Sequence, residues 1–309
     1  MRYNITIKIL IICEDTKMRT ITAKLMLLLV PLFLFLTPIS SLAYDKGIYI
    51  NQSTLENSKK LNYLIKRSKQ HGIKTFIVDL EKVTPRYKKH INLIKSNNIR
   101  YVARIVVFPH GGTADQIRSK AHWSKKYKLA KTALDFGADE IQLDYIRFKP
   151  TQKPSAKNAQ EILKIIQWFQ AKVDKPLQID VFGVASFGPS KYIGQDIKLF
   201  SKSVQAICPM VYPSHYEPYK KHAVTPYETV YDSLMAIRGQ FNGKPLPFKL
   251  IPYIELSNYR YKLSKKKKLD YIYAQIRAAE NAKADGWYVW SPQNYYDNLF
   301  KVLETKKVK

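Results

Sequence analysis

Eight short β-rich runs alternate with longer amphipathic stretches along most of this chain. The runs are rich in Val, Ile, Tyr and Phe, and the stretches between them repeat apolar residues at helical spacing, as Leu61, Leu64 and Ile65 do. The runs cover residues 47–51, 75–80, 101–108, 140–148, 177–182, 206–212, 249–255 and 286–290. This alternation predicts a parallel sheet covered by helices, and eight units favour a closed (β/α)8 barrel over an open doubly wound sheet.

The first 43 residues differ from the region of alternating runs. An apolar run at 25–39 follows basic residues and precedes Ser41-Leu42-Ala43, which is the pattern of a secretory signal cleaved after Ala43. The run is shorter than the ~20 apolar residues of a membrane span, although an uncleaved anchor is the alternative. Met18 is a second candidate start, so we read 1–43 as an over-called start plus a signal peptide. No linker divides 44–309, so we expect one exported, periplasmic or extracellular barrel domain.

Composition limits the partners and cofactors of the chain. The formal net charge is +28, which attracts anionic polymers or an anionic envelope surface, although many lysines, such as those at 265–268, lie on predicted helix faces. No zinc-finger spacing, RNA-binding aromatic signature or Gly-rich phosphate loop is present, so we expect no specific nucleic-acid binding. Cys208 is the only cysteine after the leader, which excludes an internal disulfide there. We expect no metal and no cofactor.

Strand parity places several polar residues inside the predicted barrel. Alternate residues of a barrel strand face the helices and the barrel axis. In the fourth strand Ile141, Leu143 and Tyr145 form the apolar face, so Gln142 and Asp144 face the axis. The same parity turns inward Asp79, Arg104, Asp180, Tyr212 and Trp290. Most of these residues come late in their strands, at the end where barrel enzymes build their sites.

Two residues near the strand ends are less certain. Glu255 ends the seventh strand on a face that the pattern leaves open, and His215 follows the sixth strand closely enough to reach the same end of the barrel. A lone loop histidine is more often solvated than functional. We therefore treat both residues as candidates for substrate binding.

Acids beside aromatic rings suit the cleavage of glycosidic bonds. That reaction uses one carboxyl group as proton donor and another as nucleophile or general base. Two neighbouring carboxylates raise the pKa of one of them, and aromatic rings stack on sugar faces. The alternative for Asp144 and Asp180 is a buried acid neutralised by Arg104, whereas Asp79 and Glu255 suit a structural or binding role as well as catalysis.

The fourth strand resembles a known family. Residues 139–148 read DEIQLDYIRF and resemble the signature of a bacterial family called the putative glycosyl hydrolase domain, a TIM barrel distantly similar to α-amylases. The stretches 104–108, 180–183, 209–216 and 286–292 resemble its third, fifth, sixth and eighth strands. The resemblance implies that Asp144 is the nucleophile and Asp180 a candidate acid. With the strand parity it gives as candidate substrate-binding residues Asp79, Arg104, Arg147, Tyr212, His215, Glu255 and Trp290.

Two departures from the family pattern leave two functions open. The segment after the third strand, 109–113, is short, and 251–255 reads IPYIE where relatives carry a Pro-Trp-Leu-Gln type of sequence. The first hypothesis is an exported glycoside hydrolase that cleaves an envelope or extracellular polysaccharide, which the charge suggests is anionic. The second is a non-catalytic barrel that binds carbohydrate or the envelope surface.

Overall fold

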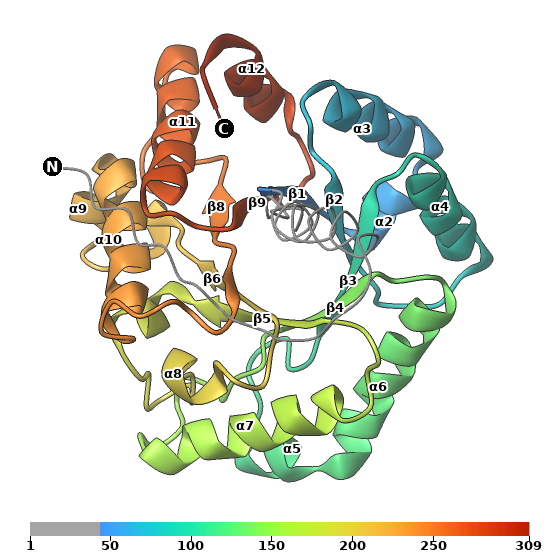
Figure 1. Cartoon of the computed structure of the whole chain (residues 1–309), viewed down its shortest axis with the longest axis vertical. Coiled ribbons are helices and arrows are strands. Elements are labelled where there is room, and N and C mark those ends of the chain that lie inside the picture. Colours follow the sequence, from blue (N-terminus) through green and yellow to red (C-terminus); the bar gives the residue numbers. More distant parts are fainter. Residues whose placement is uncertain (1–43, 309) are drawn as a thin grey trace, which may run out of the picture. The chain divides into compact units, whose positions relative to one another are not determined.

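Parallel strands form a closed ring in the computed structural model, which describes residues 44–308 (Figure 1). The strands are β1 (Asp45–Ile50), β2 (Thr75–Asp79), β3 (Arg100–Val106), β4 (Glu140–Asp144), β5 (Leu177–Phe182), β6 (Ala206–Met210), β7 (Lys249–Leu250), β8 (Tyr253–Glu255) and β9 (Gly286–Trp290). β7 and β8 together occupy the seventh place in the ring, and the β5–β6 and β9–β1 pairings close it. The predicted (β/α)8 barrel is confirmed. The predicted leader, 1–43, lies outside the described residues.

Helices surround the ring, and most of them begin at a capped residue. They are α2 (Gln52–Leu55), α3 (Ser58–Gln70), α4 (Pro85–Ser96), α5 (Ala114–Arg118), α6 (Lys120–Asp135), α7 (Ala156–Gln170), α8 (Ile197–Phe200), α9 (Tyr219–Val224), α10 (Pro226–Gly239), α11 (Lys265–Asn281) and α12 (Asp297–Thr305), with short 3₁₀ turns η1 (Gly183–Phe187) and η2 (Pro213–His215). The side chains of Asn57, Thr84 and Ser264 each accept a hydrogen bond from a backbone N–H in the first turn of α3, α4 and α11. Within 44–308, none of these helices has the length and apolarity to cross a bilayer.

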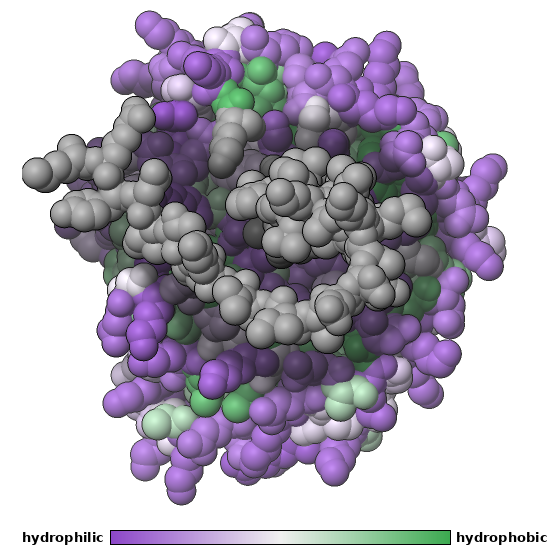
Figure 2. Space-filling view, viewed as in Figure 1, coloured by the Kyte–Doolittle hydropathy of each residue, from purple (hydrophilic) through white to green (hydrophobic). Residues whose placement is uncertain are grey.

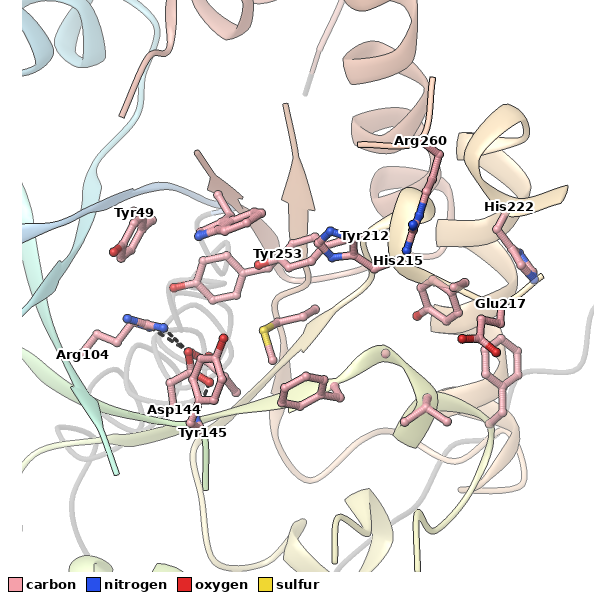
Figure 3. Close-up of a pocket in the computed structure, with 18 residues that line it drawn as sticks. Tyr49, Arg104, Asp144, Tyr145, Tyr212, His215, Glu217, His222, Tyr253 and Arg260 are labelled. Atoms are coloured by element: carbon pink, nitrogen blue, oxygen red, sulfur yellow. Dashed lines mark hydrogen bonds and ion pairs between the residues drawn. The ribbon is translucent and has the colours of Figure 1, made fainter. Parts of the chain in front are cut away.

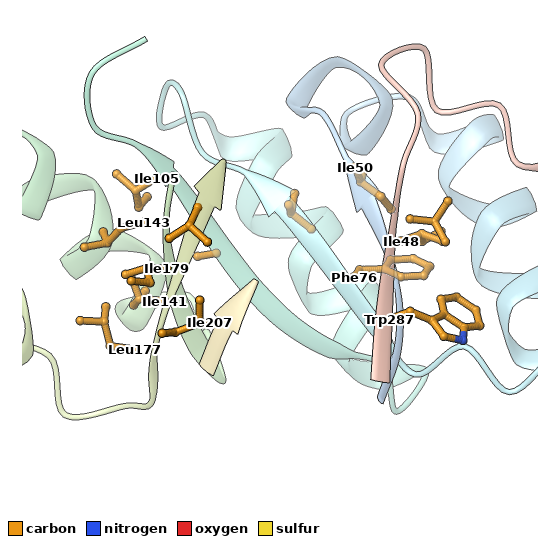
Figure 4. Packing of buried hydrophobic residues seen from close by; sticks show 14 of the residues in the cluster. Ile48, Ile50, Phe76, Ile105, Ile141, Leu143, Leu177, Ile179, Ile207 and Trp287 are labelled. Atoms are coloured by element: carbon orange, nitrogen blue, oxygen red, sulfur yellow. The ribbon is translucent and has the colours of Figure 1, made fainter. Parts of the chain in front are cut away.

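Two apolar layers hold the barrel together. The larger layer fills the space between the strands and the helices, where Figure 4 shows Phe76, Ile141, Leu143 and Ile179. The smaller layer lies inside the ring and includes Tyr253 and Tyr288. The strand parity inferred from the sequence is confirmed, because successive residues of β2, β4 and β5 alternate between the two sides. Full burial of each large apolar side chain contributes about 1.5–3 kcal/mol to folding.

A buried polar layer closes the barrel beneath the acids. Gln142 Nε2 donates to Gln178 Oε1 over 3.0 Å, Gln178 Nε2 donates to Tyr288 Oη over 3.2 Å, and Tyr253 Oη donates to Gln142 Oε1 over 2.8 Å. Gln142 and Gln178 precede Asp144 and Asp180 by two residues, so this layer lies one step toward the amino ends of the strands. The interior is therefore packed there, and the cavity described below lies toward the carboxyl ends of the strands.

Two strands differ from their predicted extents for local reasons. β4 ends at Asp144 because Tyr145 adopts a φ of +51°, in the left-handed region that a strand does not use. The predicted seventh strand divides into β7 and β8 because Pro252 has no N–H to continue the ladder. The break is local, since Tyr288 N still donates to Pro252 O over 2.9 Å.

Candidate active site

A cavity of about 870 Å³ opens at the carboxyl ends of the strands (Figure 3). Its floor carries Asp144 and Asp180, which end β4 and lie late in β5. The other lining residues come from the strand ends and the loops that follow them: Tyr49, Arg104, Tyr145, Phe182, Gly183, Val184, Phe187, Met210, Tyr212, His215, Tyr216, Glu217, His222, Tyr253, Arg260 and Trp290. Its volume is near the upper end of the range of about 300–1,000 Å³ found for ligand pockets.

One guanidinium group joins the two aspartates of the floor to a third aspartate, Asp79. Arg104 donates through Nη1 to Asp79 Oδ1 and through Nη2 to Asp144 Oδ2, and its Nε lies 3.7 Å from Asp180 Oδ2. The strand register explains the arrangement, because Asp79 of β2 lies opposite Arg104 of β3. Tyr49 Oη adds a 2.5 Å hydrogen bond to Asp79 Oδ2. One cation thus serves three carboxyl groups, which differ in their remaining contacts.

Asp180 has the properties of a proton donor. Its side chain is only 1% exposed, and its Oδ1 has no hydrogen-bond partner among the described residues. Burial and then the negative charge of Asp144 raise the pKa of Asp180 well above its usual range, and a hydrogen bond between the two acids adds to the rise. Arg104 opposes the shift without cancelling it. The protonated form of Asp180 is therefore favoured, in a side chain that lines the cavity.

Asp144 is held by donors on both carboxylate oxygens. Arg104 binds Oδ2, and the backbone N–H of Tyr145 donates to Oδ1. The left-handed turn at Tyr145 aims this N–H back at the preceding side chain, and such a conformation costs a non-glycine residue about 1–3 kcal/mol. Charged or polarised donors of this kind suit an ionised carboxylate. The two acids consequently differ in their contacts, although they share Arg104. Asp144 has a donor on each oxygen, whereas Asp180 Oδ1 has no hydrogen-bond partner among the described residues.

Aromatic rings form one wall of the cavity. Tyr212 and Trp290 stack with ring centroids 5.1 Å apart and planes 21° apart. His215 lies edge-on to Tyr212 at 5.4 Å, and Tyr259 lies 5.8 Å from Trp290. Flat apolar faces with polar edges are surfaces on which sugar rings stack.

The loops after β5 and β6 pack against each other beside the acids. A Cβ atom on Gly183 would lie 2.1 Å from Tyr216 Oη, so only glycine permits this approach. Tyr216 Oη in turn accepts a 3.0 Å hydrogen bond from Ser233 Oγ of α10. Glu217 and His222 extend the lining beyond Tyr216. The cavity therefore continues sideways from the acids under these loops.

Glu255 lies behind the cavity wall. Its fully buried carboxylate accepts hydrogen bonds from Ser214 N over 2.8 Å, Ser214 Oγ over 2.9 Å and Tyr271 Oη over 2.6 Å. Burial raises the pKa of Glu255 to about 7, and these three hydrogen bonds act in the opposite direction. Through Ser214, the carboxylate holds η2, which carries His215.

The structure brings together some of the sequence-predicted site residues and separates others. The residues that line the cavity are Arg104, Asp144, Asp180, Tyr212, His215 and Trp290. Asp79 lies beneath Arg104 and does not line the cavity. Arg147 is 8% exposed and lies over the rings of Tyr145 and Phe182, with Cζ 5.5 and 4.7 Å from their centroids. Asp79, Arg147 and Glu255, expected to bind substrate, instead contact other residues around the site.

Several lining residues were not among the candidates from the sequence. Tyr49 and Tyr253 face the axis by the same strand parity that identified Asp144, so that signal could have found them. Tyr216, Glu217 and Arg260 lie in loops and His222 lies in the short helix α9, where no strand periodicity predicts direction. For these four residues the sequence carries no corresponding signal.

The chemistry of the site depends on its two carboxyl groups. Across residues 44–308, no group of three or more His, Cys, Asp or Glu side chains is arranged to hold a metal ion. The arrangement combines a buried acid of raised pKa, a neighbouring carboxyl group held by donors, and an aromatic wall in one cavity. That combination can donate a proton to a leaving oxygen while a second carboxylate acts on the adjoining carbon.

Comparison with known proteins gives the same fold and a family. The model of a family described as "putative glycosyl hydrolase domain" matches residues 115–296, a range that includes both acids. No curated protein matches the chain.

Solved structures similar to this chain are barrels of distant sequence. The Bacillus cereus spore cortex-lytic enzyme SleL has a TM-score of 0.61 and 12% identity over 84% of this chain and 74% of that one. SleL of Bacillus megaterium QM B1551 has a TM-score of 0.60 and 12% identity, covering 86% and 76%. A GH18 chitinase from Pseudoalteromonas aurantia has a TM-score of 0.56 and 11% identity, covering 84% and 98%. At these identities the likeness shows the fold.

Proposed function

The chain belongs to the family described as a putative glycosyl hydrolase domain, and from that premise we propose that it is an exported glycoside hydrolase that cleaves an envelope or extracellular polysaccharide. The observation that carries the proposal is the pairing of Asp144 with Asp180 on one guanidinium group at the floor of the cavity. The pair supplies the two carboxyl groups of a glycosidase in different protonation environments.

In the proposed reaction the two acids have separate roles. Asp180 donates its proton to the glycosidic oxygen, and the bond from that oxygen to the anomeric carbon breaks. Asp144 attacks the anomeric carbon and forms a glycosyl ester. Water, deprotonated by Asp180, then attacks the same carbon and releases Asp144, which restores both groups. Overall, one water molecule is consumed and one glycosidic bond is replaced by a hydroxyl group on each of the two sugar fragments.

Arg104 suits this cycle because it contacts both acids. It stabilises the carboxylate of Asp144 before the attack and the carboxylate of Asp180 after proton donation. The guanidinium stays charged throughout, since arginine is not deprotonated in proteins. It can therefore compensate whichever acid is negative without moving far.

The cavity supports an oligosaccharide segment as substrate. The stacked Tyr212 and Trp290 offer a surface for a sugar ring, and the volume of about 870 Å³ extends well beyond the acids. The names of structurally similar proteins, a spore cortex-lytic enzyme and a chitinase, are those of enzymes that act on polysaccharides. A polymer of sugars is thus the substrate class that we propose.

The proposed export rests on the sequence. The apolar run at 25–39 and the small residues of Ser41-Leu42-Ala43 support secretion with cleavage after Ala43. Mass spectrometry of the protein recovered outside the cytoplasm tests this. A mature chain beginning at Tyr44 supports export with cleavage, whereas an intact leader in the membrane fraction supports the uncleaved anchor.

Hydrolysis is tested by incubating the purified protein with a panel of envelope and extracellular polysaccharides and measuring new reducing ends. We expect cleavage by the wild-type protein and none by Asp144→Asn. Asp135→Asn is the matched control, because it makes the same chemical change on the exposed surface of α6. No cleavage by the wild type, or equal cleavage by all three proteins, refutes the proposal.

A second function is favoured by one observation. Arg104 engages Asp79, Asp144 and Asp180 together, as in a structural ion network. If the three aspartates serve only to hold Arg104, the alternative function is a barrel that binds carbohydrate without cleaving it. Retention of the wild-type protein on an immobilised polysaccharide, with no reducing ends released, identifies this function in the same panel.

A further inference from the structure

Arg260 lies across the cavity from the acids, in the segment between β8 and α11 (Figure 3). Its guanidinium lies over the ring of Tyr219, with Cζ 3.5 Å from the ring centroid. Its Nε donates a 3.1 Å hydrogen bond to Ser214 O. A stacked ring and a backbone acceptor together orient the planar group, which reduces the conformational entropy that a ligand must remove.

Beside its contacts with Tyr219 and Ser214, the Arg260 side chain lines the cavity, where a ligand can reach it. Most other arginines of the described chain form an ion pair with a carboxylate, as Arg67, Arg104 and Arg277 do. No carboxylate in residues 44–308 lies within 4.0 Å of the Arg260 guanidinium. An oriented arginine at a cavity wall without an acidic partner is a receptor for an oxyanion, which its two terminal nitrogens can bind in a bidentate manner.

Neighbouring charges favour an anion at this side of the cavity. Lys220 and Lys221 of α9, and Lys262 and Lys265 before and in α11, are all exposed close in sequence to the residues that hold Arg260. Figure 2 shows that the visible periphery of the molecule is largely hydrophilic. The charge of Arg260 is also felt within the cavity, because burial and then Arg260 lower the pKa of His215.

Glu217 limits where the anion can lie. It lines the same side of the cavity, and its Oε1 accepts a 2.7 Å hydrogen bond from Tyr219 Oη. A second carboxylate at Glu217 would be repelled, whereas a sugar hydroxyl there could donate a hydrogen bond. The site therefore fits one acidic group at Arg260 flanked by neutral hydroxyl groups.

We infer that Arg260 binds an acidic substituent, a carboxylate or a phosphate, on the sugar chain that enters the cavity, so that the substrate is an anionic glycan. This inference rests on the proposed function for the statement that the bound glycan is a substrate. The binding site itself depends only on the contacts of Arg260. The net charge of +28 suggests that the molecule as a whole attracts anions, and this inference assigns anion binding to a single residue.

The competing explanation is non-specific attraction of anions to a basic protein. Arg86 provides the comparison, because it is exposed in the first turn of α4, does not line the cavity and has no carboxylate within 4.0 Å among the described residues. Non-specific attraction would affect Arg86 and Arg260 alike and would weaken steeply with salt. A built site would distinguish them.

The experiment observes the arginine side chains directly in the full chain labelled with nitrogen-15 arginine. The Nε–H resonances are recorded at mildly acidic pH, where they exchange slowly, and are assigned with Arg260→Lys and Arg86→Lys. The Arg260 signal is protected further by its hydrogen bond to Ser214 O. Glucuronate, glucose 6-phosphate and glucose are titrated separately at physiological salt.

We expect the Arg260 resonance to shift saturably with glucuronate or glucose 6-phosphate, with a dissociation constant at least about ten-fold lower than for glucose. The more effective of the two acidic sugars identifies the carboxylate or the phosphate as the preferred group. The Arg86 resonance should remain unchanged. No shift at Arg260, equal shifts at both arginines, or equal effects of glucose and the acidic sugars would each overturn the inference.

The result is independent of turnover. Absence of hydrolysis in the polysaccharide panel together with a saturable shift at Arg260 would refute the glycoside hydrolase and leave an anionic-glycan site. Hydrolysis of neutral polysaccharide without any shift at Arg260 would support the enzyme and refute the site. The two proposals can therefore fail separately.

Discussion

Asp180 lies against Arg104 with only one of its two carboxyl oxygens engaged. Its Oδ2 is 3.7 Å from Arg104 Nε, whereas its Oδ1 is buried without a hydrogen-bond partner in the described chain. An ionised carboxylate would leave that oxygen poorly compensated, and a protonated one places a transferable proton at the cavity floor. Burial and then the charge of Asp144 raise the pKa of Asp180, and its unpartnered oxygen is free to carry the proton, which gives Asp180 the role of donor.

Replacement of Asp180 should affect substrates according to their leaving groups. Asp180→Asn removes the donor and should lower kcat about 10²–10⁴-fold on a sugar leaving group. The loss should be much smaller on an aryl glycoside whose phenolate leaves without protonation. Asp144→Asn should lose activity on both substrates. Equal losses by Asp180→Asn on both substrates would contradict the assignment of the proton donor.

Wild-type activity should also fall as the pH rises. Asp180 donates only when protonated, so kcat/KM should be lost as the pH rises through the raised pKa of Asp180. The pH profile on a sugar leaving group measures this limb. Its persistence in Asp180→Asn would show that another group causes it.

Removal of Arg104 should destabilise the fold most at high pH. Without the guanidinium, Asp79, Asp144 and Asp180 form a buried cluster of like charges. Removing one partner of a buried ion pair costs about 3–5 kcal/mol of stability. Without the cation the three carboxyl groups repel one another once they ionise, so stability is lost as the pH rises. Urea unfolding of Arg104→Gln should therefore show a larger deficit at about pH 8 than at about pH 4.

A matched variant separates charge from packing in that experiment. Adding Asp79→Asn to Arg104→Gln removes one of the repelling carboxylates and should recover part of the stability at about pH 8. A deficit that is the same at both pH values and is unaffected by Asp79→Asn would indicate lost packing of the Arg104 side chain instead.

The floor of the site could be predicted because it lies on strands. A strand has a period of two, so the apolar faces of β4 and β5 determine that Asp144 and Asp180 point to the axis. The order of the strands then brings Arg104 beside them. The position of a residue along a barrel strand thus predicts the direction of its side chain, even when the sequence does not predict the activity.

The rest of the site depends on contacts between distant segments. Arg260 is oriented by Ser214 of η2 and Tyr219 of α9, and no spacing in the sequence indicates that contact. Glu255 follows Pro252, whose missing N–H interrupts the strand, and its carboxylate turns toward Tyr271 of α11. Loops and breaks have no period, so their side-chain directions came only from the structure.

Trp290 should contribute to substrate binding more than to the chemical step. Trp290→Ala removes a ring that stacks on Tyr212, and the value of such aromatic contacts, about 0.5–1.5 kcal/mol, corresponds to a rise in KM of roughly two- to ten-fold. Trp290→Phe keeps a ring and should retain most of the affinity. Steady-state kinetics on a cleaved polysaccharide measures both variants. A large fall in kcat with unchanged KM would place Trp290 in the chemical step.

Glu255 should make the stability of the barrel depend on pH near neutrality. Its folded-state pKa of about 7 exceeds the ordinary value of 4.5, so the group stabilises the fold below about pH 4.5 and this stabilisation is lost as the pH rises to about 7. The difference corresponds to roughly 3 kcal/mol. Glu255→Gln can accept from Ser214 N and Tyr271 and donate to Ser214 Oγ, but it does not titrate. Relative to this variant, urea unfolding should show the wild-type protein losing stability between about pH 5 and pH 8. A constant difference between the two proteins over that range would show that Glu255 keeps one protonation state.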